Sequence, residues 1–186
     1  TISLENNPYL KEGMYFLRII SNWELGHTPL LSIDAEGTNN DCTDVIPLEI
    51  NSFEYHYARE IIADTAAIGA GTEIITVDGV APLNSALKSA YIDTTLPVID
   101  PGEDIPLTNV LAELTATATD TTALTFLWEQ TTGPGELIFS TPLALTTTVS
   151  GPIDTEATYE ISFTAIDAAG NSATSMINLE WDSLSP

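Results

Sequence analysis

The chain has 186 residues, of which 44% are hydrophobic and 17% charged, so it can bury a core and lacks the composition of a disordered segment. Four Lys and Arg against 27 Asp and Glu give a formal net charge of −23, which repels phosphate backbones and anionic lipids and excludes nucleic acid as a partner. No apolar run reaches the roughly 20 residues that cross a bilayer, and a single cysteine, Cys42, excludes an intramolecular disulfide and a cysteine-based zinc cluster.

The first half alternates short apolar runs with turn-forming residues. Runs rich in β-branched or aromatic residues predict strands over residues 14–20, 30–33, 53–62 and 73–77. Two alanine-rich stretches, residues 63–70 and 83–90, could instead form a helical turn. The Gly-Ala-Gly-Thr sequence at 69–72 lacks the ending of a phosphate-binding loop and is interpreted as a hairpin turn.

The composition changes near Asp93. All four basic residues, Lys11, Arg18, Arg59 and Lys88, precede it, and no Lys or Arg follows Lys88. Residues 91–97 form a polar, β-branched strip closed by a proline, which favours an extended linker. We therefore predict two domains, residues 1–95 and 96–186. Residues 180–186 have a similar composition, and no signal-like stretch follows Thr1, so we expect a mature or excised soluble fragment from a series of modules.

The second half has the clearest strand signals. From Tyr159 to Ala165 apolar side chains alternate with Glu160, Ser162 and Thr164, which predicts a strand with one buried face. The same period occurs over residues 114–118, 124–128 and 177–181. Gly- and Pro-containing segments at 133–135 and 151–152, and the Asp-Ala-Ala-Gly-Asn sequence at 167–171, predict the turns of an antiparallel sandwich.

Three segments of this half carry a resemblance to a known family. They are PVIDPGED at 97–104, LTFLWEQTTGP at 124–134 and YEISFTAIDAAGN at 159–171. Through them residues 96–182 resemble a polycystic-kidney-disease (PKD) repeat, an immunoglobulin-like sandwich. The resemblance implies that Trp128 is the largest core side chain, on a central strand, and that Gly170 turns a hairpin with positive φ.

The first half is similar to another family. LSIDAEGT at 31–38 and IDTTLP at 92–97 resemble the bacterial immunoglobulin-like repeats of large surface adhesins. Together the two resemblances imply an all-β chain of two tandem immunoglobulin-like antiparallel β-sandwiches. They also imply an extracellular, non-catalytic stalk, spacer or adhesive segment of a large cell-surface protein, whose partners are neighbouring modules and a surface glycan or protein.

An acidic segment in the first half is one candidate for a metal site. Residues 34–44 offer four carboxylates and two amides, the oxygen ligands that Ca²⁺ prefers, with Asp34, Glu36, Asn39 and Asp41 as the candidate ligands. The spacing is not that of an EF-hand, and a solvated acidic loop explains the same residues.

The predicted linker is a second candidate. The Asp120 loop and the Asp167 hairpin project from the end of the second sandwich where its first strand begins, so Asp93 is expected nearby. Three carboxylates brought together repel one another, and Ca²⁺ would neutralise them and stiffen the linker. Plain solubility is the alternative explanation of the acidic surface.

Evidence for catalysis is weak. His27, His56 and Cys42 belong to no nucleophile motif, and 27 acids guarantee accidental carboxylate pairs, so we predict no enzyme activity. Trp23 and Trp181 are the aromatic residues expected at the surface, and Trp23 is the candidate ligand-binding residue. The alternative function is therefore an accessory substrate- or carbohydrate-binding module of a secreted hydrolase.

Overall fold

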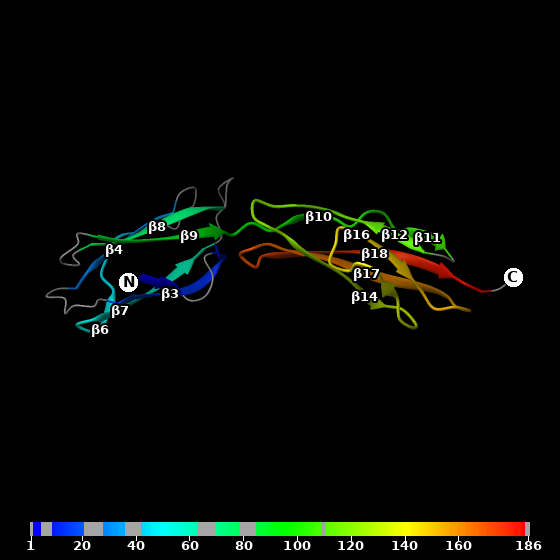
Figure 1. The fold of residues 1–186 in the computed structure, drawn as a ribbon, viewed down its shortest axis with the longest axis horizontal. Coiled ribbons are helices and arrows are strands. Elements are labelled where there is room, and N and C mark those ends of the chain that lie inside the picture. Colours follow the sequence, from blue (N-terminus) through cyan, green and yellow to red (C-terminus); the bar gives the residue numbers. More distant parts are fainter. Residues whose placement is uncertain are drawn as a thin grey trace. The chain divides into compact units, whose positions relative to one another are not determined.

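The computed structural model describes residues 2–4, 9–20, 28–35, 42–62, 70–78, 85–108 and 111–184. The chain separates into two compact units, residues 1–95 and 96–186. The described residues form strands and connecting segments, and no helix among them is long and apolar enough to cross a membrane (Figure 1). The predicted all-β class is confirmed.

The first unit contains two sheets. One has the order β1-β3-β7-β6, formed by Ile2–Leu4, Gly13–Ile20, Glu54–Ile61 and Leu48–Asn51. The other has the order β2-β9-β8-β4-β5, formed by Tyr9–Leu10, Ser85–Asp93, Ala70–Asp78, Leu30–Ala35 and Cys42–Val45. Alternation decides which side chains are buried: Leu17 and Ile19 are in the core, whereas Phe16 and Arg18 face outward.

Two sequence predictions in the first unit are wrong. Residues 85–90 belong to strand β9 instead of a helical turn, because β9 pairs over nine residues with β8, and this pairing overrides the helical preference of alanine. Residues 70–72 begin β8, so the hairpin turn predicted at 69–72 is also wrong. Residues 63–69 lie outside the described part of the chain.

The second unit contains three sheets. A four-stranded sheet has the order β11-β18-β17-β14, formed by Ile105–Thr108, Ser172–Asp182, Glu156–Ile166 and Thr125–Thr132. A three-stranded sheet has the order β12-β16-β15, formed by Ala112–Thr115, Thr146–Ser150 and Ile138–Phe139. Strands β10 (Val98–Asp100) and β13 (Thr117–Thr119) form a separate pair. The strand predicted over 114–118 is therefore divided, because Ala116 donates its backbone N–H to Leu145 between β12 and β13.

Strands β17 and β18 form a long hairpin (Figure 1), and one face of this hairpin contributes to the core of the second unit. The residues facing it include Tyr159, Ile161, Phe163, Ala165, Ile177, Leu179 and Trp181. Trp128 packs against Phe163 with ring centroids 4.7 Å apart. Its buried position confirms the prediction, but β14 is an edge strand and not a central one. A neighbouring segment shields this edge, since Trp128 donates its backbone N–H to Pro142 and its indole N–H to Ala144.

Trp181 corrects another expectation, because only 3% of it is exposed. Its indole N–H donates to the Pro152 carbonyl at 2.8 Å, which satisfies the polar atom of the buried ring. Trp181 therefore belongs to the core and offers no surface for a sugar.

Each unit also contains one parallel strand pair, where the sequence predicted antiparallel sheets. Strand β2 pairs in parallel with β9, and strand β11 pairs in parallel with β18. In both cases an early strand of the unit lies beside its last strand.

Candidate metal centre

The turn after β17 fixes the position of Asp167. Asp167 Oδ1 accepts hydrogen bonds from the backbone N–H groups of Gly170 and Asn171, and Oδ2 accepts one from the Asn171 side-chain amide at 2.7 Å. Gly170 has φ of 91°, a conformation that disfavours a side chain, as the sequence predicted. These bonds satisfy a carboxylate that is only 6% exposed.

A second turn, between β13 and β14, fixes Asp120. Its Oδ1 accepts hydrogen bonds from the Thr122 backbone N–H at 2.9 Å and from the Thr122 and Thr121 hydroxyls. Every hydrogen bond that the described residues give to Asp120 falls on Oδ1. The Thr122 hydroxyl also accepts the Ala168 backbone N–H, so this turn is joined to the hairpin of Asp167.

Asp93 is the last residue of β9 and is fully buried. Its Oδ1 accepts the backbone N–H of Thr95 at 3.1 Å and the hydroxyl of Thr95 at 2.6 Å. This local turn holds the carboxylate at the start of the segment that leads to β10.

Asp120 and Asp167 lie in two turns of the second unit that the hydrogen bond from Ala168 to Thr122 joins. Asp93 is the last residue of the last strand of the first unit. Carboxylates are the ligands that a hard divalent cation prefers. We call Asp93, Asp120 and Asp167 the three candidate aspartates, or the aspartate cluster, after the site that the sequence predicts.

The other predicted metal ligands lie mostly outside the described residues. Asp34 lies in β4, and residues 42–44 lie in β5, so both ends of the predicted acidic loop are strand residues. Glu36, Asn39 and Asp41 lie outside the described residues, as does the predicted ligand-binding residue Trp23. Their roles stay predictions.

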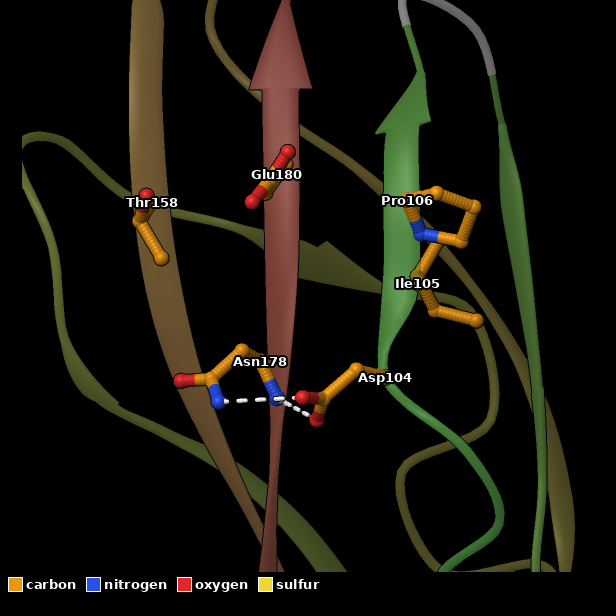
Figure 2. A pocket seen from close by; sticks show the side chains of 6 residues that line it. All are labelled: Asp104, Ile105, Pro106, Thr158, Asn178 and Glu180. Carbon is orange, nitrogen blue, oxygen red and sulfur yellow. Dashed lines mark hydrogen bonds between the residues drawn. The ribbon is translucent and has the colours of Figure 1, made fainter.

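An open hollow on the second unit was not predicted. It has a volume of about 530 Å³ and is lined by Asp104, Ile105, Pro106, Thr158, Asn178 and Glu180 (Figure 2). Asp104 accepts the backbone N–H of Asn178 at 2.7 Å and its side-chain amide at 3.3 Å. The backbone bond, followed by the side-chain bond, lowers the pKa of Asp104. These bonds attach the start of β11 to β18, which indicates a structural role.

His56, the one histidine among the described residues, lies in an ion-pair network. Glu54 Oε1 accepts Arg18 Nε at 2.6 Å and lies 2.7 Å from His56 Nε2. The hydrogen bond from Arg18, then that from His56, lowers the pKa of Glu54 to about 2. No described cysteine or serine nucleophile is hydrogen-bonded to this histidine, so the network resembles a surface ion pair rather than a catalytic site.

Comparisons with known proteins agree with the resemblance of the second half of the chain to a PKD repeat. A family model described as K319L-like, PKD domain, matches residues 102–180. No curated protein matches the chain.

Several solved structures are similar to the chain. The solution structure of the PKD domain from KIAA 1837 protein is 22% identical with a TM-score of 0.39, and the match covers 47% of this chain and 88% of that one. The three N-terminal domains of the bacteriophage RB49 highly immunogenic outer capsid protein are 14% identical with a TM-score of 0.37, covering 97% and 59%. The D00-D0 domain of intimin is 11% identical with a TM-score of 0.36, covering 96% and 99%.

Proposed function

Because residues 102–180 form a PKD-type immunoglobulin-like repeat, we propose that the chain is a non-catalytic spacer or adhesive segment of a large secreted or cell-surface protein. It works outside the cell, joined to neighbouring modules, and carries mechanical load between them. The observation that carries this proposal is the parallel pairing of early and last strands in each unit.

The pairing suits a load-bearing role for a geometric reason. In the second unit Ile105 pairs with Leu179 and Thr108 with Trp181, so β11 and β18 run in the same direction. Tension that pulls the start of β11 and the end of β18 apart loads their hydrogen bonds along the strands. Several bonds must then break together, whereas a pull across the strands breaks them one at a time.

The first unit repeats this arrangement on a smaller scale. Tyr9 pairs with Tyr91 and Leu10 with Ile92, and both Leu10 and Ile92 are buried in one apolar cluster. Burial of this pair keeps water from the adjoining hydrogen bonds. Each unit thus has its own resistance to extension.

Force spectroscopy tests the proposal. The full chain is pulled once from its two termini, and once through cysteines introduced by Glu103→Cys and Met176→Cys, with Cys42→Ser in both. These two positions are near the same end of the β11–β18 pair, so the second pull opens it bond by bond. We expect the second unit to unfold at a clearly higher force in the terminal pull. Equal forces in the two directions would remove the load-bearing argument.

The aspartate cluster supports a second element of the proposal, calcium binding. The donor types fit Ca²⁺: all three residues are carboxylates, Asp93 and Asp167 are buried, and the hydrogen bonds that the described residues give to Asp120 fall on Oδ1. Asp93, Asp120 and Asp167 would hold the ion, which would supply positive charge where three negative charges meet. Binding would fix residues 93–97 against the turns at Asp120 and Asp167.

Thermal unfolding tests the calcium proposal. At physiological ionic strength, Ca²⁺ at 100 times its Kd should stabilise the chain by about 2.7 kcal/mol relative to chelator. Asp120→Asn should remove this gain, because its Oδ1 can keep the bonds to Thr122 while the other oxygen is lost. Asp154→Asn, an exposed position before β17, removes the same charge and should retain the gain. Identical melts with calcium and with chelator would contradict calcium binding and leave the load-bearing proposal intact.

A further inference from the structure

The outer face of sheet β1-β3-β7-β6 in the first unit exposes large apolar side chains. Met14 and Phe16 on β3 are each 57% exposed, and Leu48 on β6 is 68% exposed. The strand register places Phe16 beside Ala58 and Leu48 beside His56, so these residues share one side of the sheet. We call Met14, Phe16, Leu48 and Ala58 the apolar outer face.

The second unit shows that a sandwich of this kind does not need such a face. The outward residues of its β17–β18 hairpin include Thr158, Thr164, Thr174, Asn178 and Glu180, and Met176 is the main apolar exception. An outer sheet face of hydroxyls and acids is soluble and contributes little to association. A cluster of exposed large apolar side chains on the first unit is therefore a mark of a binding surface.

Charge around the apolar outer face limits what can cover it. Glu60 lies beside Met14, and Glu54 holds Arg18 in an ion pair at 2.6 Å. The one arginine that the register places on this side of β3 is thus already matched by a carboxylate. The border of the face is net acidic, and a complementary surface is apolar at its centre and basic at its border.

Other occupants fit less well. A second copy of the chain brings another charge of −23 toward the first, which opposes association at low salt. An anionic lipid surface is repelled for the same reason. A sugar platform usually needs an aromatic ring with hydrogen-bonding neighbours, whereas Phe16 lies beside Ala58 and Met14, and Arg18 on the same face is already engaged by Glu54.

We propose that the apolar outer face of the first unit docks a protein segment whose apolar centre is bordered by lysines or arginines. This inference goes beyond the proposed load-bearing function, because it concerns a face of the first unit and not its paired terminal strands. The apolar contacts supply affinity, and Glu60 together with the chain's net charge of −23 selects the basic partner.

Three synthetic peptides of equal length probe the face by titration calorimetry. The first has the sequence Arg-Arg-Val-Leu-Val-Ile-Arg-Arg, the second replaces the arginines with glutamates, and the third replaces the four apolar residues with serines. Each is titrated into the full chain, into Phe16→Ser/Leu48→Ser, and into Met176→Ser as a matched change on the second unit. All three positions are at least half exposed, and thermal melts verify that the variants fold.

We expect the first peptide alone to bind, and the Phe16→Ser/Leu48→Ser variant to bind it at least about tenfold more weakly. Met176→Ser should bind it as the parent does. Equal binding of the serine peptide would mean that charge alone acts, and equal binding by the double variant would place the contact elsewhere. Either result, or no binding of the first peptide, overturns the proposal. Sedimentation provides a further check. If the parent chain sediments as a dimer and the Phe16→Ser/Leu48→Ser variant as a monomer, a second copy of the chain occupies the face and the proposal is overturned.

Discussion

In the second unit, β17 buries Tyr159, Ile161 and Phe163, and the residues beside them in the strand are polar. In the first unit, β3 buries Leu17 and Ile19 yet leaves Met14 and Phe16 largely exposed. Both patterns make a stable strand, because each provides one apolar face for the core. The difference lies in the opposite face, which is mostly polar on the β17–β18 hairpin and carries large exposed apolar side chains on β3.

Trp128→Ala should have the largest effect and should be confined to the second unit. Removing this 1%-exposed side chain deletes contacts with Phe163 and leaves a cavity, at a cost of about 3–5 kcal/mol. Calorimetry should show the transition of the second unit falling by more than about 12 °C. Phe16→Ala removes an aromatic ring that is 57% exposed and should change stability by about 0.5 kcal/mol or less. Similar losses from the two variants would contradict the contrast between the units.

Gly133→Ala should come next. A Cβ at this position would lie 2.3 Å from Cδ1 of the buried Tyr159 ring, and φ is 124°. Backbone strain and crowding together should cost about 2–4 kcal/mol, measured by denaturant unfolding. Gly13→Ala in the first unit has a similar φ of 146° but its nearest atom is 4.0 Å away, in Tyr15. The loss of stability in Gly13→Ala should therefore come from backbone strain alone. An equal loss in the two variants would show that neighbouring atoms move away from the added Cβ at Gly133.

Tyr159→Phe should have a moderate effect. The Tyr159 hydroxyl donates to the Pro134 carbonyl, and its loss should cost about 1 kcal/mol. Tyr55→Phe in the first unit should be nearly neutral, because no described residue hydrogen-bonds its hydroxyl. Burial raises the pKa of both phenols above the ordinary value of 10.0. The contribution of each neutral phenol to the free energy of unfolding is therefore fully present below pH 10.0 and is lost as the pH rises through the raised pKa. Each variant should therefore unfold at a higher pH than the parent when stability is measured across the alkaline range. An unchanged pH of alkaline unfolding would contradict burial of the phenols as the cause.

Glu54→Gln should have the smallest effect. The lowered pKa of Glu54 means that its carboxylate stabilises the first unit above about pH 4.5 and loses this contribution as the pH falls toward 2. Because Arg18 and His56 are substantially exposed, the shift in Tm at pH 7 should be a few degrees at most and should shrink in high salt. Melts from pH 2 to 7 should show the parent and variant converging at low pH. A constant difference across that range would assign the effect to packing.

The second unit could be predicted in detail because its signals are local. Alternation from Tyr159 to Ala165 and the glycine at 170 each define an element without knowledge of its partner. Strand β9 could not be predicted in this way. Its alanines and Lys88 carry weak strand preference, and its pairing with β8 supplies the stabilisation.

The site was only partly accessible to sequence reasoning. Each aspartate of the cluster carries a local signal, because it precedes residues that form a turn, and the expected sandwich topology places the two loops at one end. Binding of an ion to them stays a prediction. The contact of Asp104 with Asn178 joins residues 74 positions apart, and nothing in either local sequence indicates the pairing.

The parallel pair of β11 and β18 also fixes an order of events during synthesis. Strand β11 emerges early, but its partner is the last strand of the unit, so the unit cannot close its sheet until nearly all of its sequence has appeared. The β17–β18 hairpin joins adjacent strands and can form without waiting for distant residues. Until β18 has appeared, β11 lacks this partner, and a stalled or truncated chain would carry the exposed edge of β11 into contact with its neighbours.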